Sequence, residues 1–296
     1  MQAGVINKRS PGDAKIVTIL TMVKFSHTIF ALPMALMSAL LAVSGGWPSA
    51  EKLILIVLAM IGARNGAMAF NRLADEKFDA ANPRTKDRAL PQGKLTRQQI
   101  WWFVIFCSLL FFAAAYFLGR LAFYLSPLAL AIIFFYSYTK RFTHYAHIVL
   151  GISLGLAPMG AWIGIRDSLD LIPLLLGITV IFWVAGFDII YACQDTEFDT
   201  RAGLHSVPQY FGVRRALIIS AVFHLITLGL LYWIKTLAGL GIFYSLAWMS
   251  VAGLLTYEHC LVKPNDLKHV NQAFAIVNGM VSVVLFFGTL LDRFYG

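Results

Sequence analysis

Charged residues are scarce in this chain. Only 13% of its 296 residues are Asp, Glu, Lys or Arg, whereas about one quarter of the residues of a typical soluble domain are charged. Hydrophobic residues make up 59% of the chain, and its mean hydropathy is +0.72. This balance excludes an ordinary soluble domain and predicts a polytopic membrane protein.

Cysteines and acidic residues are also few. The three cysteines, Cys107, Cys193 and Cys260, do not have the spacing of a disulfide framework or a zinc site. Lys and Arg outnumber Asp and Glu by 24 to 15, which gives a net charge of +9. These basic residues lie in short connections between apolar runs rather than on one soluble face, so the charge does not indicate nucleic-acid binding.

Nine apolar runs are long enough to cross a bilayer as helices, which takes about 17 to 25 residues. They lie near residues 17–43, 52–72, 99–118, 121–137, 146–164, 171–190, 215–233, 237–257 and 271–291. The first run is too long for a signal-peptide core, so we expect it to remain as a span. Arg120 and Pro127 interrupt the fourth run. The sequence therefore predicts an all-α membrane protein with about nine transmembrane helices.

The basic residues are distributed unequally between the two sides of this arrangement. Most lie on the side of the N-terminus, and the opposite side carries Lys52, Arg120, Arg166, Lys235 and Arg293. Cytoplasmic loops are enriched in Lys and Arg. We therefore expect the N-terminus and the polar loops after the second and sixth spans to be cytoplasmic, and the C-terminus to lie outside.

Two acidic segments with the same four-residue spacing each follow an apolar run. They consist of Asn71, Asp75 and Asp79 and, 120 positions later, of Tyr191, Asp195 and Asp199. Positions i, i+4 and i+8 of a helix share one stripe of its surface, so each segment is expected to carry a column of oxygen ligands. Carboxylates crowded at the end of a membrane helix need a compensating cation. Paired acidic columns suit Mg²⁺ ions that bridge to a phosphorylated substrate.

The recurrence of the motif, in which Phe78 matches Phe198, suggests an internal repeat. We expect one domain over residues 1–296, built from halves of roughly 16–140 and 141–260 and a last helix near 271–291. The two motifs would then face each other across a central cavity. Solvated loop charges would explain one such cluster, but they explain two clusters at equivalent positions poorly.

Around these motifs the chain resembles the UbiA superfamily of intramembrane aromatic prenyltransferases. The similarity is carried by residues 64–85, 88–93, 136–141, 188–199 and 203–208, and the pattern of spans fits over essentially the whole chain. One departure is Arg72, which follows Asn71 where many 4-hydroxybenzoate enzymes of this type have Asp. That departure resembles a branch that includes menaquinone-pathway members.

The resemblance implies Mg²⁺-dependent transfer of a polyprenyl group from its diphosphate to an aromatic acceptor. The leading expectation is 4-hydroxybenzoate in ubiquinone biosynthesis, and the alternatives are a naphthoate-type acceptor in menaquinone biosynthesis or the haem, chlorophyll and homogentisate branches. The partners would be polyprenyl diphosphate, the aromatic acceptor and bilayer lipid, in a bacterial inner membrane. A transporter is an alternative of another class, because intramembrane carboxylates also line transport pathways.

The resemblance also assigns roles to residues. Metal ligands and catalytic groups would be Asn71, Asp75, Asp79, Asp195 and Asp199, where a metal cluster would stabilise the departing pyrophosphate. Candidate diphosphate contacts are Lys140, Arg72, Arg141, Arg84 and Lys77, with Lys140 favoured because the family match includes it. Anchoring by the positive-inside rule is the alternative for these cations. Tyr191 would support the site through its hydroxyl or ring, or else anchor the membrane interface.

Arg64, Lys24 and Asp188 lie inside predicted spans and need a reason to be there. Arg64 lies about two turns deeper than Asn71 on the same face. Arg64 and Lys24 are candidates for binding the carboxylate of an aromatic acid or the terminal phosphate, and snorkelling is the alternative. Asp188, one level deeper than Asp195, is a candidate base that deprotonates the acceptor or the ring intermediate. It could equally be a structural partner of Arg64 or Lys24.

Overall fold

The computed structural model describes residues 17–19, 21–23, 31–272 and 276–296. The long helices in this part of the chain are α2 (Leu32–Leu41), α3 (Ala50–Ala74), α5 (Arg97–Leu118), α6 (Arg120–Thr139), α7 (Ala146–Arg166), α8 (Leu171–Ala192), α11 (Val213–Ala238), α12 (Ile242–Leu261) and α14 (Asn278–Tyr295). Short helical elements are α4 (Glu76–Ala81), η2 (Cys193–Asp195), α9 (Thr196–Ala202), α10 (Val207–Phe211) and α13 (Val270–Gln272). No β-strand occurs within the described ranges. The prediction of an all-α fold is confirmed.

Six helices of the described chain are long and apolar enough to cross a membrane, namely α3, α5, α6, α7, α8 with its short extension, and α11. The protein is therefore an integral membrane protein. Pro127 lies inside α6, which continues from Arg120 to Thr139, so the predicted interruption of this span is absent. Helix α2 is a shorter apolar helix of 10 residues, and α12 and α14 have 20 and 18 residues.

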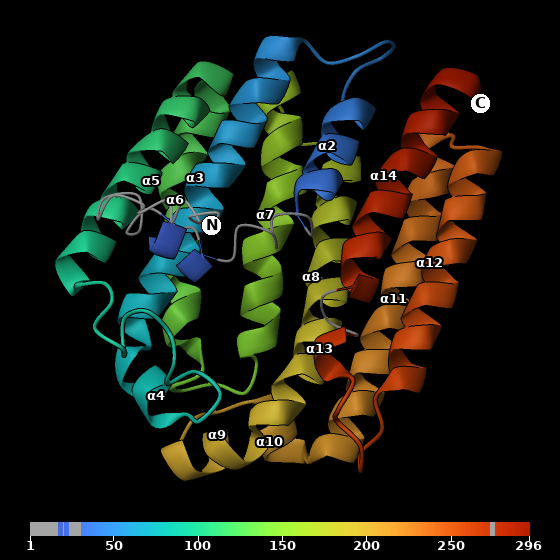
Figure 1. Ribbon diagram of the computed structural model, residues 1–296. Helices are drawn as coiled ribbons and strands as arrows, with labels where there is room; N and C mark the ends of the chain where they lie inside the picture. Colours follow the sequence, from blue (N-terminus) through green and yellow to red (C-terminus); the bar gives the residue numbers. More distant parts are fainter. Residues whose placement is uncertain (1–16, 20, 24–30, 273–275) are drawn as a thin grey trace, which may run out of the picture.

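The helices form one bundle whose two sides meet at α7 and α8 (Figure 1). On one side α3 packs against α5 and α6, and on the other α11, α12 and α14 pack side by side next to α8. The short helices α4, α9 and α10 lie together at one end of the bundle. We call this end the motif face, because both acidic motifs run into these short helices.

Glycines allow the closest helix pairs to approach. A Cβ atom on Gly62 of α3 would lie 2.7 Å from the carbonyl oxygen of Cys107 in α5, and one on Gly151 of α7 would lie 2.5 Å from that of Ile181 in α8. Small residues at such contacts let helix backbones approach and pack, which drives association of transmembrane helices. These contacts fix α3 and α7, two walls of the space between the sides of the bundle.

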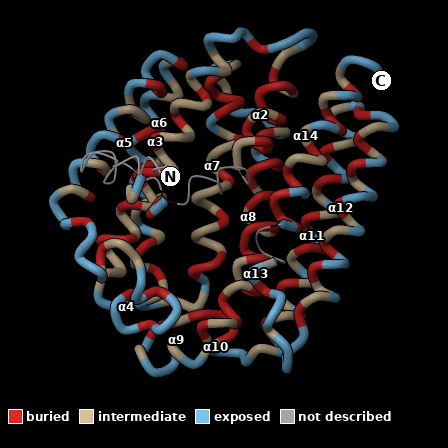
Figure 2. The backbone as a smooth tube through the Cα atoms, in the orientation of Figure 1, coloured by how far each residue is buried: buried red, intermediate tan, exposed pale blue. Residues whose placement is uncertain are grey.

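Burial differs between the outer and central helices (Figure 2). Helix α8 is largely buried, whereas α5 and α6 expose large apolar side chains such as Trp102, Phe106, Phe117 and Tyr124. An apolar outer surface is what a bilayer-facing helix requires. Helix α8 is therefore the central helix on which both sides of the bundle pack.

A buried polar network ties α8 to the last helices. Trp183 Nε1 donates to Asn278 Oδ1 (2.8 Å), and Asn278 Nδ2 donates to Glu258 Oε1 (2.7 Å). His224 Nδ1 and His259 Nε2 lie 3.0 Å apart beside this chain of bonds. Because buried polar groups are costly without partners, the network fixes α11, α12 and α14 against α8.

Candidate active site

Both acidic motifs are broken at their middle aspartate. Asp75 lies between α3 and α4 with φ −95° and ψ 8°, and Asp195 precedes α9 with φ −102° and ψ 4°. Both residues occupy the sparsely populated bridge region of backbone conformation. The expectation of a continuous helical column is therefore wrong, because Asp79 and Asp199 lie on separate short helices. Both motifs start a new short helix after this aspartate, although a 3₁₀ turn, Cys193–Asp195, precedes that helix only in the second.

One cavity of about 680 Å³ lies between α3, α5, α6, α7 and α8. The predicted ligands that line it are Asn71, Asp75, Asp79, Asp195 and Asp199, together with Tyr191 and Asp188. The two motifs thus lie in the same cavity. Away from the motif face its wall is mainly apolar and reaches Leu118, Leu125, Ile163 and Leu169, near the opposite ends of the helices.

Two arginines hold Asp79 in the first motif. Arg72 Nη1 donates to Asp79 Oδ2 (3.1 Å), and Arg88 Nη1 donates to Asp79 Oδ1 (2.6 Å). Asp79 is only 6% exposed. Burial raises the pKa of Asp79 to about 6, since the desolvation of its carboxylate outweighs the attraction of Arg72.

Asp75 has weaker partners than Asp79. It accepts a hydrogen bond from Asn71 Nδ2 (2.8 Å) and lies 3.7 Å from Arg141 Nη2. Burial also raises the pKa of Asp75. The Arg141 guanidinium stacks over the rings of Tyr138 and Phe78 and donates to the carbonyl of α3's last residue (2.6 Å). Arg141 therefore sits at the junction between the first motif and the loop after α6.

Arg84 holds Asp195 in the second motif. Its Nε donates to Asp195 Oδ1 (2.9 Å) and its Nη2 to Oδ2 (2.5 Å), which is the bidentate geometry that arginine favours with carboxylates. Its Nη1 donates to the Tyr191 hydroxyl (2.9 Å), and Asn82 Nδ2 donates to Asp195 Oδ1 (3.3 Å). Arg84 and Asn82 follow α4, so the loop after the first motif contacts the second motif directly.

Asp199 is the least satisfied of the carboxylates. It is 2% exposed, and its Oδ2 lies 3.6 Å from Lys140 Nζ without a hydrogen-bond partner. The carbonyl oxygen of Lys140 accepts from the backbone N–H of His205 (2.7 Å). A buried carboxylate oxygen that lacks a donor is costly, so this position favours an additional cation.

Deeper in the cavity, Asp188 pairs with His147. The His147 Nδ1 lies 2.7 Å from Asp188 Oδ2, and the backbone N–H of Val207 donates to His147 Nε2 (3.3 Å). The described partner of Asp188 is therefore His147 rather than Arg64, and pairing with Lys24 falls outside the described residues. His147 was missed, although the rule applied to ionisable groups inside spans would have selected a histidine at the start of an apolar run.

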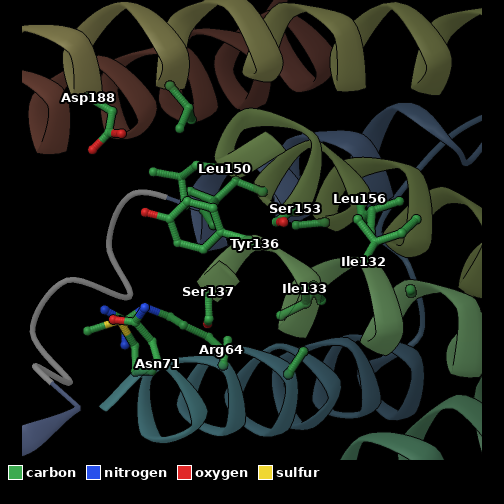
Figure 3. Close-up of a pocket in the computed structure, with 18 of the residues that line it drawn as sticks. Arg64, Asn71, Ile132, Ile133, Tyr136, Ser137, Leu150, Ser153, Leu156 and Asp188 are labelled. Atoms are coloured by element: carbon green, nitrogen blue, oxygen red, sulfur yellow. The ribbon is translucent and has the colours of Figure 1, made fainter. Parts of the chain in front are cut away.

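The remaining cations predicted inside the spans are only partly described. Arg64 lines the cavity and donates to the Val23 carbonyl oxygen (3.2 Å). Figure 3 shows Arg64 and Asn71 on one wall, Asp188 on the opposite wall and Tyr136 between them. Lys24 lies outside the described residues. The deep part of the cavity thus has a cation on one side and a carboxylate on the other.

The oxygen donors suit a hard divalent cation, since Mg²⁺ is bound by carboxylates and other oxygen ligands. In the described part of the chain, no three His, Cys, Asp or Glu side chains are close enough together to hold a metal ion. Each aspartate of the motifs is instead paired with an arginine or lysine. The donor set fits magnesium, as does Asp199 Oδ2, which has an ion pair with Lys140 but no hydrogen-bond donor. The basic side chains are the partners that the metal would replace.

These features define a class of protein. A membrane-embedded helical bundle whose deep apolar cavity is closed at one end by facing acidic motifs and cations is suited to a substrate with an apolar tail and an anionic head group. The family model described as the UbiA prenyltransferase family matches residues 31–287, and the chain belongs to this family. The protein is therefore a prenyltransferase.

Curated relatives and solved structures agree with this assignment. The chain is 31% identical over 248 residues to the 4-hydroxybenzoate octaprenyltransferase of Yersinia pseudotuberculosis, covering 83% of this chain and 85% of the relative. It is 32% identical over 254 residues to the enzyme of that name from Klebsiella pneumoniae, covering 86% and 88%. The apo structure of a UbiA homolog from Aeropyrum pernix K1 is 32% identical, with a TM-score of 0.82 over 90% of this chain and 98% of that one.

A further solved structure shows the same fold at lower identity. A UbiA homolog from Archaeoglobus fulgidus bound to DMAPP and Mg²⁺ is 20% identical, with a TM-score of 0.68 over 90% of this chain and 99% of the other. This likeness supports the shared bundle architecture. The family predicted from the motif residues is confirmed.

Proposed function

We propose that this enzyme transfers a polyprenyl group from polyprenyl diphosphate to 4-hydroxybenzoate in ubiquinone biosynthesis and requires Mg²⁺. The observation that carries the proposal is the single cavity that both acidic motifs and five cations line at one end, with Arg64 deeper and a mainly apolar wall beyond. Relatives named 4-hydroxybenzoate octaprenyltransferase at 31% and 32% identity favour this acceptor. The Archaeoglobus fulgidus homolog bound to DMAPP and Mg²⁺ supports the donor and the metal.

The residues that would hold Mg²⁺ are Asn71, Asp75, Asp79, Asp195 and Asp199. When bound, the metal neutralises the diphosphate and stabilises the charge that develops on the leaving pyrophosphate. The basic residues at this end, Arg72, Arg84, Arg88, Lys140 and Arg141, would turn from the carboxylates toward the diphosphate oxygens. The Tyr191 hydroxyl, already bonded to Arg84, would orient that guanidinium.

On the acceptor side, the two deep walls of the cavity have complementary roles. Arg64 would bind the carboxylate of the aromatic acid, and Lys24 is the second candidate for this contact. Asp188 on the opposite wall would accept the proton from the ring carbon after the prenyl carbon has bonded to it. The allylic C–O bond breaks, one C–C bond forms, and the ring proton passes to the carboxylate.

We also propose the membrane arrangement expected from the sequence. Helices α2, α12 and α14 would complete nine spans with the six apolar helices, as two halves of residues 16–140 and 141–260 followed by the last helix. The excess of Lys and Arg at the motif face supports a cytoplasmic position for that face in a bacterial inner-membrane protein. Reactivity of single cysteines introduced into the two connecting faces toward an impermeant reagent would test this orientation.

A naphthoate-type acceptor in menaquinone biosynthesis is the second candidate. The observation that favours it is Arg72, which follows Asn71, is 7% exposed and pairs with Asp79 instead of adding a carboxylate to the motif. The first motif therefore has one acidic group fewer than many 4-hydroxybenzoate enzymes.

An acceptor panel separates the two candidates. Purified protein is incubated with Mg²⁺, geranyl diphosphate and a panel that contains 4-hydroxybenzoate and a dihydroxynaphthoate, and prenylated products are identified by mass spectrometry. We expect product from 4-hydroxybenzoate. Product from the naphthoate alone would replace the first candidate by the second, and the absence of any prenylated aromatic product would refute the proposed acceptor class.

A further inference from the structure

We propose that His147 is a positioning residue, which fixes Asp188 as the base that removes the ring proton. The inference rests on the proposed function, since it concerns the acceptor half of that reaction. His147 and Asp188 are 41 positions apart in sequence and meet between α7 and α8 at the wall of the cavity. The proposal assigns a role to a histidine that does not itself line the cavity.

The hydrogen bonds of His147 determine which nitrogen carries the proton. A backbone N–H can only donate, so the bond from Val207 to Nε2 (3.3 Å) requires an unprotonated Nε2. In the neutral ring the proton is then on Nδ1, which donates to Asp188 Oδ2 at 2.7 Å. The side chain of His147 is 1% exposed, so water does not compete for either nitrogen.

The donor to His147 is held in place by the loop that follows the second motif. Val207 is the first residue of α10, and the first N–H groups of a helix have no acceptor within that helix. Ser206 caps α10 by accepting from the Gln209 N–H (3.3 Å), and the His205 N–H donates to the Lys140 carbonyl (2.7 Å). The loop between the second motif and α10 therefore supports the proposed base indirectly.

Asp188 presents its other oxygen to the cavity. Its side chain is 14% exposed and lines the cavity, and within the described residues no donor bonds to Oδ1. One carboxylate oxygen is thus fixed by His147, and Asp188 lies on the wall across the cavity from Arg64 (Figure 3). A carboxylate that is oriented by one hydrogen bond and open on the other side has the geometry of a general base.

The step can be written with all atoms accounted for. The prenyl C–O bond breaks with its electron pair on the pyrophosphate, and a ring carbon ortho to the hydroxyl forms the new C–C bond. The proton on that ring carbon passes to Asp188 Oδ1, and its electron pair restores aromaticity. His147 keeps its proton throughout and stabilises the carboxylate before the transfer.

Two substitutions at His147 separate positioning from structural support. His147→Asn places an amide donor near the position of Nδ1, whereas His147→Leu fills similar space without a donor. Both variants lose the Nε2 acceptor of the Val207 N–H, so loss of that hydrogen bond should destabilise the two proteins equally. We expect kcat to fall about 10- to 100-fold in His147→Leu, with an unchanged KM for the diphosphate, and most of the activity to remain in His147→Asn. Equal losses in two folded variants would overturn the proposal.

The kinetic isotope effect with a ring-deuterated acceptor would not change if His147 had only a structural role. We expect the kinetic isotope effect on kcat to be larger in His147→Leu than in the wild type or in His147→Asn, because slower proton removal becomes rate-limiting. Asp188→Asn should show a lower kcat than His147→Leu. An isotope effect that stays unchanged in His147→Leu despite a lower kcat would contradict action through the base.

The tautomer of His147 can be measured without any substrate. We expect ¹⁵N NMR of histidine-labelled protein, assigned by comparison with His147→Asn, to show a protonated Nδ1 and an unprotonated Nε2. A proton on Nε2 would refute the positioning role. If wild-type protein prenylates another ring instead of 4-hydroxybenzoate, the proposed acceptor alone fails, and the kinetic series is run with the ring that reacts.

Discussion

The two acidic motifs share a backbone but differ in the charges that surround them. Asp75 and Asp195 break their helices with nearly the same dihedral angles. The cations that line the cavity are Arg64, Arg72, Arg84, Arg88, Lys140 and Arg141, all of which precede the second motif. Within the described lining, the segment after residue 141 contributes carboxylates and no lysine or arginine.

This difference shows which features the two motifs share and which they do not. The backbone geometry that presents oxygen ligands occurs in both motifs, whereas the compensating cations all lie between residues 64 and 141. Arg84 and Lys140 reach from there to Asp195 and Asp199. The second motif therefore depends on the first half of the chain for its compensating charge, and the two halves are electrostatically one site.

Removal of divalent ions is the strongest test of whether both motifs serve one metal site. We expect a chelator to abolish product formation and added Mg²⁺ to restore it, because no protein cation can occupy all the positions of the missing ions. Product formation is measured with the same acceptor before and after chelation. If turnover is unchanged by the chelator, the motifs do not act through a bound metal ion.

Loss of the middle aspartate of either motif should have nearly the same effect. We expect Asp75→Ala and Asp195→Ala each to lower kcat by about 10³-fold, the scale for removing a preorganised electrostatic group. Both proteins should still fold and enter the membrane. Retained activity in one variant alone would show that the motifs are functionally unequal despite their matched backbones.

The bridge between the halves can be tested at Arg84. Arg84→Ala removes the bidentate contact with Asp195 and a candidate diphosphate ligand, and we expect kcat/KM to fall about 10- to 100-fold. Arg84→Lys should recover part of this loss, since lysine keeps the charge without the fork geometry. Lys86→Ala, an exposed position in the same loop, is the matched control and should stay near wild type.

Proton competition should distinguish the first motif by its pKa. The pKa of Asp79 is raised to about 6 from 3.8, so the folded protein holds this proton more tightly than free aspartate does. A metal ion must displace it, and the apparent Mg²⁺ dissociation constant should rise about tenfold per pH unit below pH 6. Titration of activity with Mg²⁺ at several pH values measures this. An apparent Mg²⁺ dissociation constant that does not change between pH 7 and pH 5 would contradict the assignment of Asp79 as a metal ligand.

The smallest expected difference concerns packing beneath the motifs. Gly66 and Gly186 each lie five residues before the first member of their motif. A Cβ on Gly66 would lie 3.3 Å from Cys107 Cβ, whereas one on Gly186 would lie 2.4 Å from His224 Nε2. We expect Gly186→Ala to destabilise the protein by about 1 to 3 kcal/mol and Gly66→Ala to be nearly neutral. Thermal unfolding in detergent, compared between the two variants, checks this order.

The sequence predicted the helices well because bilayer thickness sets their length. The runs near 99–118 and 171–190 correspond to Arg97–Leu118 and Leu171–Ala192. The four-residue spacing of the motifs wrongly predicted a continuous helix through Asp75, since spacing alone does not reveal where one helix ends and another begins. The sequence also could not predict the partners of the carboxylates, because these contacts depend on tertiary packing. Arg84, for example, contacts Asp195 from 111 positions away in sequence.

The orientation of the cavity has a consequence for the product. Charged groups lie at the motif face, and apolar residues such as Leu118 and Leu169 lie at the far end. If the proposed function is correct, the isoprenoid tail stays within the hydrocarbon layer during the reaction. At the aqueous boundary the aromatic acceptor replaces the diphosphate as its polar head group. The finished amphiphile is then already aligned with the leaflet it joins, and the reaction demands no lipid flipping.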